Sequence, residues 1–123
     1  MKFIAILLLL PFTLFAKEDR LIIVGASYGK NVLAICEPDG SVIWKYDTGG
    51  PERGHTGHHD LQLLPNGNIL FHDSWSVTSE ITLDRKITWK HDSKDASVHA
   101  FQRLANGHTM IAESGLGRIV HLD

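Results

Sequence analysis

Residues 59–71 read His59-Asp60-Leu61-Gln62-Leu63-Leu64-Pro65-Asn66-Gly67-Asn68-Ile69-Leu70-Phe71, and residues 99–111, forty positions later, read His99-Ala100-Phe101-Gln102-Arg103-Leu104-Ala105-Asn106-Gly107-His108-Thr109-Met110-Ile111. The His, Gln, Leu, Asn and Gly positions coincide. A second element, residues 32–46, contains an apolar run, a Pro-Asp-Gly turn and Trp44. It recurs in residues 81–91 around Trp89, with a turn that is two residues shorter. A period of about 40–45 residues indicates a repeat architecture.

The repeated elements are typical of β-strands. Asn66-Gly67 and Asn106-Gly107 are strong hairpin signals, because tight two-residue turns favour positive φ at both central positions. Short β-branched and aromatic runs lie between the turns. We therefore predict an all-β chain in an up-and-down meander, with strands at 20–25, 31–36, 41–47, 58–64, 68–73, 78–84, 86–91, 98–104, 108–113 and 118–123.

Four-stranded units of this period are the blades of β-propellers. The chain holds about two and a half such units, at residues 20–47, 58–91 and 98–123. A β-sandwich is the alternative, which explains the turns but leaves the forty-residue period unexplained. A closed propeller needs about four or more blades. We therefore expect either a piece of a longer product or several copies that assemble into a ring, with open blade edges that invite self-association.

The N-terminal segment has the pattern of a signal peptide. Lys2 precedes an apolar run over residues 3–10, and Ala16 stands before the charged residues 17–20. This pattern predicts a signal peptide over residues 1–16, a mature domain over residues 17–123, and export to the periplasm or the exterior. A retained N-terminal anchor is the alternative.

The composition narrows the choice of partners. The chain of 123 residues carries a net charge of −2, which gives no electrostatic basis for binding nucleic acid or an anionic membrane. Cys36 is the single cysteine, so an internal disulfide or a multi-cysteine metal site is excluded. The expected partner is a small molecule or a protein, with no membrane contact after signal cleavage.

Several motifs resemble known propeller families. The pattern Asp39-Gly40-x-x-x-Trp44 resembles the tryptophan repeats of quinoprotein-type (PQQ-like) propellers. Residues 58–68, 98–104 and 111–115 are similar to bacterial arylsulfotransferase-type propellers and their exported relatives. In the active members a channel histidine transiently carries a sulfuryl group, and His59 and His99 match such positions. Pyrroloquinoline quinone itself is not expected, because the chain is too short to enclose it, and we predict no cofactor.

Propeller topology would place one end of each blade around a common channel mouth. The start of a unit's first strand, the end of its second strand and the following loop share this end, which binding groups favour. His59 and His99 are the candidate catalytic residues. The rest of the candidate ligand-binding face consists of His55, His58, Asp60, His72, Asp73, Trp75, Arg103 and Glu113.

This face has three interpretations. It could transfer sulfuryl groups, with a neutral imidazole as nucleophile and Arg53 or Arg103 to stabilise the sulfate oxygens. It could hold a metal through the histidines of residues 55–59 and Asp60, although we assign no metal. His59 and His99 could also be structural, hydrogen-bonding the backbone where a strand begins. We predict a binding or interaction scaffold, with a fragment of an arylsulfotransferase-type enzyme, acting on phenolic compounds, as the alternative.

Overall fold

The computed structural model describes residues 21–26, 31–48, 60–94 and 96–123, which form ten strands in three small antiparallel sheets. Sheet 1 contains β1 (Ile22–Ala26), β2 (Val32–Cys36) and β3 (Val42–Asp47). Sheet 2 contains β4 (Leu61–Leu63), β5 (Ile69–His72), β6 (Val77–Ile81) and β7 (Ile87–Asp92). Sheet 3 contains β8 (Val98–Arg103), β9 (Thr109–Glu113) and β10 (Arg118–Leu122), with the short 3-10 helix η2 (Ser114–Leu116) between the last two. The prediction of an all-β chain is confirmed.

Each sheet is a meander in which strands that follow one another in sequence pair with one another. The forty-residue repeat is visible in the register. Gln62 of β4 pairs with Leu70, and Gln102 of β8 pairs with Met110. Sheets 1 and 2 also share a register shift at the corresponding point, between Ile35 and Cys36 in β2 and between Glu80 and Ile81 in β6.

The Asn-Gly hairpins differ from the two-residue turns that the sequence predicts. Gly67 and Gly107 have φ of +83° and +88°, but neither preceding asparagine has positive φ. Each loop contains three residues, closed in the first case by the Leu64 N–H bonded to the Asn68 carbonyl at 2.8 Å. This is the geometry of a type I turn followed by a left-handed glycine. The Asn66 side chain accepts the Asn68 N–H at 3.0 Å, which fixes the turn without a second positive φ.

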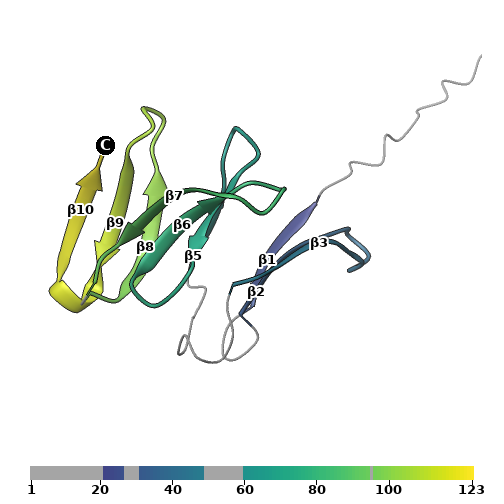
Figure 1. The fold of residues 1–123 in the computed structure, drawn as a ribbon, viewed down its shortest axis with the longest axis horizontal. Helices are drawn as coiled ribbons and strands as arrows, with labels where there is room; N and C mark the ends of the chain where they lie inside the picture. Colours follow the sequence, from purple (N-terminus) through teal and green to yellow (C-terminus); the bar gives the residue numbers. More distant parts are fainter. Residues whose placement is uncertain (1–20, 27–30, 49–59, 95) are drawn as a thin grey trace, which may run out of the picture.

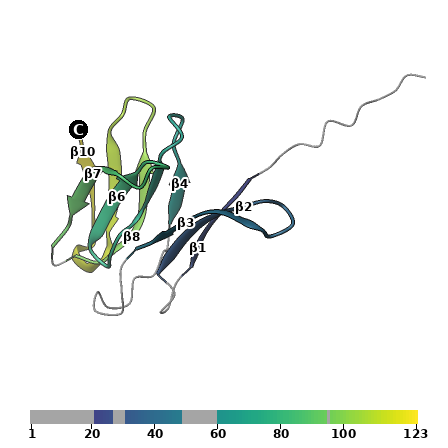
Figure 2. The same ribbon diagram turned by 45° about the vertical axis from the view of Figure 1, so that its right-hand side comes forward.

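Two apolar cores hold the three sheets in a stack. Leu33 and Ile35 of sheet 1 meet Ile69, Phe71 and Ile81 of sheet 2 in the first core. The second core lies between sheets 2 and 3 and contains Leu64, Leu70, Val98, Phe101 and Ile111. Sheet 2 therefore lies between the other two, as Figures 1 and 2 show. A β-sandwich has two packed sheets, so this three-layered stack departs from that alternative.

The two repeat tryptophans take equivalent places in the stack. Trp44 of β3 packs against the first core, and Trp89 of β7 packs against the second. The Trp44 indole N–H also donates to the Leu83 carbonyl at 2.7 Å, which ties sheet 1 to the β6–β7 turn. Within the described residues the three sheets do not close into a ring, and sheets 1 and 3 each keep one broad face that no described sheet covers.

Candidate functional site

Trp75 and His99 meet where sheets 2 and 3 join. Trp75 lies in the β5–β6 connection and His99 near the start of β8, and their rings stand edge to face with centroids 6.0 Å apart. The Val98 N–H donates to the Trp75 carbonyl at 3.0 Å, which fixes the connection against β8. Trp75 is 51% exposed and His99 is also exposed. An aromatic surface and an imidazole are thus presented together to solvent.

His72 and Asp73 lie deeper at the same end of sheet 2. His72 is 1% exposed and stands edge to face against Phe101 of sheet 3 at 4.8 Å. The Asp73 carboxylate accepts the Ser79 hydroxyl at 3.4 Å and lies 3.8 Å from the Lys90 ammonium. Both side chains are buried, in contact with sheet 3 through Phe101 and with β6 and β7 through Ser79 and Lys90.

Glu113 occupies in sheet 3 the repeat position that Asp73 has in sheet 2. Its carboxylate accepts the Arg118 Nε–H at 2.6 Å and lies 3.8 Å from His91 Nε2. The hydrogen bond from Arg118 is the main cause of a lowered pKa of Glu113, against an opposing contribution from burial. Glu113 is therefore held as a paired carboxylate that links β7, β9 and β10.

Asp60 connects the inner strands of two neighbouring sheets. Its carboxylate accepts the N–H of Leu61 at 2.9 Å and the N–H of Phe101 at 3.0 Å. Gln62, two residues later, accepts the Arg103 N–H at 2.8 Å and donates to the Arg103 carbonyl at 3.3 Å. The side chains of Asp60 and Gln62 thereby satisfy backbone groups on the free edge of β8, which would otherwise be open to another strand.

Arg103 lies at the opposite end of β8 from His99. Its guanidinium pairs with Glu80 at 3.1 Å and stacks over the Trp89 ring at 5.1 Å. Burial tends to raise the pKa of Glu80, but hydrogen bonds from Asn68 and Asn66 and the charge of Arg103 outweigh it and lower that pKa. The structure thus places Arg103 in the contact between sheets 2 and 3, away from the rim.

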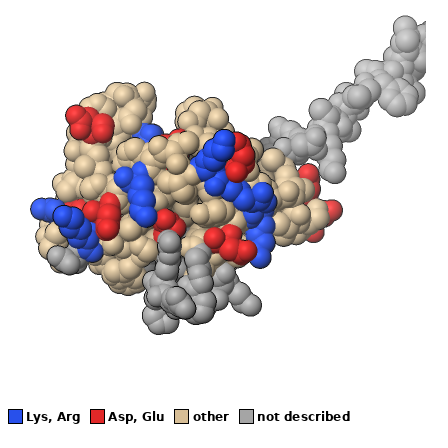
Figure 3. All heavy atoms as spheres, in the orientation of Figure 1, with Lys and Arg blue, Asp and Glu red and all other residues tan. Residues whose placement is uncertain are grey.

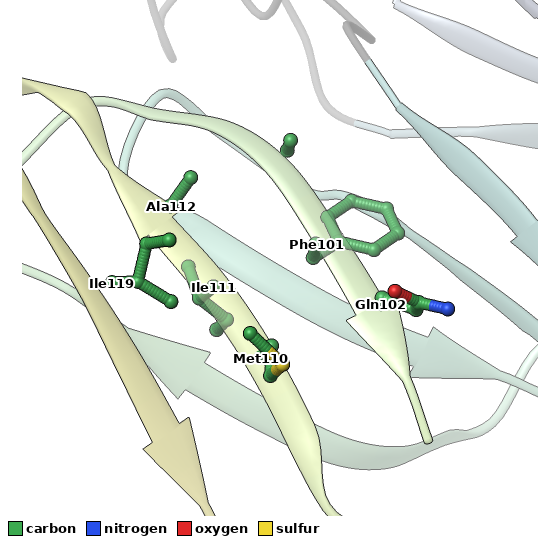
Figure 4. A pocket seen from close by; sticks show the side chains of 7 residues that line it. Phe101, Gln102, Met110, Ile111, Ala112 and Ile119 are labelled. Carbon is green, nitrogen blue, oxygen red and sulfur yellow. The ribbon is translucent and has the colours of Figure 1, made fainter. Parts of the chain in front are cut away.

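The uncovered face of sheet 3 carries an open apolar hollow of about 180 Å³. In Figure 4, Met110, Ala112 and Ile119 lie on this face, and Phe101 and Ile111 form the floor behind them. Ile119 is 67% exposed. Gln102 lies at the edge of the hollow, in the repeat position of Gln62. This apolar hollow is a candidate binding surface that the sequence patterns did not single out.

Three of the predicted site residues, His55, His58 and His59, lie outside the described residues, as does Arg53. Among residues 21–26, 31–48, 60–94 and 96–123, no three His, Cys, Asp or Glu side chains gather as a metal-binding group. The same part of the chain holds no helix that is both long and apolar enough to cross a membrane. Acidic and basic side chains are interspersed on the face seen in Figure 3.

Comparison with known proteins supports the fold alone. A scan against protein-family models and a search of curated proteins gave no match. Among solved structures, the chain is similar to a crystal structure of a protein of unknown function from Bacteroides caccae, with a TM-score of 0.63 and 23% sequence identity. The match covers 76% of this chain and 33% of that one, so this chain spans about a third of that protein's length. It is consistent with an all-β stack of small antiparallel sheets.

Proposed function

We propose that this chain is a segment of a β-propeller and serves as an interaction scaffold, in which the uncovered face of sheet 3 packs against sheet 1 of a second copy. The observation that carries the proposal is the contact between sheets 2 and 3 within the chain. On the face of sheet 2 that contacts sheet 3, the Gln62 side chain binds the Arg103 backbone, and Leu70 lies in the second core. Gln102 and Met110 stand at the corresponding positions of sheet 3, on its uncovered face.

Sheet 1 supplies the complementary surface. Leu33 and Ile35 of this sheet face sheet 2, and because side chains alternate along a strand, Ile22 and Ile43 face the other way. These two side chains are 48% and 53% exposed. The net charge of −2 opposes self-association only weakly. A head-to-tail contact would continue the stacking that the three sheets already have.

Sedimentation equilibrium of the purified chain and of the variants Ile119→Lys and Ile43→Lys tests this proposal. We expect the mass of the wild-type chain to rise with concentration and each variant to remain monomeric. A mixture of the two variants should form a heterodimer, because each keeps the face that the other has lost. A wild-type chain that stays monomeric, or a mixture that fails to associate, would contradict the head-to-tail contact.

A second candidate function is the binding of a small aromatic anion at the rim. Trp75 and His99 favour it, because an indole face and an imidazole together suit a ring that carries a negative group. The arylsulfotransferase alternative is a proposal on the same residues. The described residues support this activity less, because it needs an arginine to stabilise the sulfate oxygens. Arg103 is paired with Glu80, and Arg118 is paired with Glu113.

The probe for this site is 4-nitrophenyl sulfate. Calorimetric titration should give binding that is lost in Trp75→Ala and His99→Ala and kept in Trp44→Phe, whose indole lies between sheets 1 and 2. Release of 4-nitrophenol with transfer to phenol would support the enzyme. Binding without release supports a binding site at the rim that has no transfer activity, and no binding excludes both proposals at the rim.

Export also stays a proposal, based on the predicted signal peptide at residues 1–16. Expression in a Gram-negative host followed by intact-mass analysis of the periplasmic fraction tests it. A chain that begins at Lys17 is the expected product, and a full-length chain in the membrane fraction would favour the retained anchor.

A further inference from the structure

Two histidines meet at the hairpin end of sheet 3, away from Trp75 and His99. His108 lies directly before β9, and His121 lies in β10 opposite Met110. His108 Nδ1 and His121 Nε2 are 3.2 Å apart, and the ring centroids are separated by 4.8 Å with a tilt of 39°. His108 is half-buried and His121 is exposed, so the pair can be reached from solvent.

The repeat shows what this position does elsewhere in the molecule. The corresponding residues of sheet 2 are Asn68 and Glu80, because Glu80 pairs with Leu70 as His121 pairs with Met110. Asn68 donates to Glu80 at 2.6 Å, and Glu80 binds the Arg103 guanidinium of the next sheet. In sheet 3 both members of the pair are imidazoles. The position that binds an arginine guanidinium in sheet 2 therefore carries two imidazole nitrogens in sheet 3, and these nitrogens can act as metal ligands.

We propose that His108 and His121 chelate a late first-row transition-metal ion through Nδ1 and Nε2. Two nitrogens bound at about 2.0–2.1 Å to a tetrahedral ion are about 3.3 Å apart, close to the separation found here. Imidazole nitrogens prefer zinc, copper and nickel among the common ions. Water fills the remaining coordination positions, because the described residues bring no third His, Cys, Asp or Glu to the pair.

The proton balance of this step is simple. In the metal-free pair, one neutral ring donates its N–H to the other ring's unprotonated nitrogen. Metal binding requires both facing nitrogens to be unprotonated. The donor ring therefore moves its proton to its other nitrogen, which faces away, and a neutral pair releases no net proton. Both ligands come from one chain and lie on the same face of sheet 3 as Met110, so the metal titration is carried out at a protein concentration at which the chain is monomeric.

Zn²⁺ titration followed by long-range ¹H–¹⁵N spectra of the histidine rings tests the site directly. We expect the ¹⁵N resonances of His108 Nδ1 and His121 Nε2 to shift together. The double variant His108→Asn/His121→Glu is the matched control, because it recreates the hydrogen-bonded pair that Asn68 and Glu80 form in sheet 2. This variant should keep the fold, shown by its backbone amide spectrum, and calorimetric titration should show the loss of one Zn²⁺ site relative to the wild type, because both imidazole ligands are gone.

Histidines elsewhere in the chain provide the internal reference. His99→Ala should leave the shifts of the pair and its Zn²⁺ affinity unchanged, because His99 lies at the other end of sheet 3. The proposal would be overturned if the two ring nitrogens stayed unshifted at saturating Zn²⁺. It would equally be overturned if the double variant bound Zn²⁺ with the stoichiometry and affinity of the wild type.

Discussion

The Gln62 side chain binds both backbone polar groups of Arg103, a residue that lies 41 positions further along the chain. Oε1 accepts the Arg103 N–H at 2.8 Å and Nε2 donates to the Arg103 carbonyl at 3.3 Å. This amide therefore pairs with the Arg103 part of the free edge of β8 and links sheet 3 to sheet 2. The glutamine of the repeat is thus a link between sheets.

Removing this link should destabilise the fold. Gln62→Ala leaves the N–H and C=O of Arg103 without these partners, and we expect the free energy of unfolding to fall by about 1–3 kcal/mol. Urea denaturation at low protein concentration measures the loss. The matched control is Gln102→Ala, at the same repeat position on the uncovered face, which should change stability by less than about 0.5 kcal/mol. Equal losses in both variants would contradict the assigned role.

The pair of Arg103 and Glu80 should matter more than an exposed ion pair. Arg103→Ala leaves a buried carboxylate and removes the cation from the Trp89 ring, so we expect a loss of about 3 kcal/mol. Lys86→Ala breaks the exposed pair with Asp84 and should cost less than about 0.5 kcal/mol. Thermal and urea unfolding compare the two variants. A similar, small effect of both would show that the contact contributes little to stability.

Stability should depend on pH through Glu80. Its pKa in the folded chain lies below the ordinary value of 4.5, so folding favours the carboxylate. The resulting stabilisation is complete above the unfolded-state pKa and is lost as the pH falls through the folded-state pKa. Urea unfolding from about pH 7 to about pH 3 should show a shallower decline in Glu80→Gln than in the wild type. A slope in Glu80→Gln that equals the wild-type slope would refute the prediction.

The left-handed glycine of the β4–β5 hairpin should tolerate asparagine better than alanine. Gly67 has φ of +83° and nothing lies within 4 Å of the position of an added Cβ, so the cost of substitution comes from the backbone alone. Gly67→Ala should lower stability by about 1–2 kcal/mol. Gly67→Asn should cost less, because asparagine enters the left-handed region more readily. Thermal unfolding ranks the two variants, and the reverse order would show that φ is not the limiting factor.

The ten strands could be predicted from the sequence because their signals are local. Alternation, turn residues and the forty-residue spacing placed each strand within a few residues of its observed position. Most of the predicted binding face was assembled from strand register, but Arg103 was added to it as a cation that could stabilise sulfate oxygens. Its pairing with Glu80 depends on packing between sheets, which the sequence alone does not show. The His108–His121 pair depends on how β9 and β10 register, which the sequence alone leaves open.

The order of residues along the chain determined the all-β class, the turns and the repeat, since each follows from backbone preferences within a few residues. Only the tertiary structure decided which faces meet. It buried Phe71 and Ile111, left Ile119 exposed, and brought the rings of Trp75 and His99 together. The physical reason is that the stacking of sheets is governed by contacts some forty residues apart. Such contacts depend on the shape and hydrogen bonding of whole faces, which no local pattern contains.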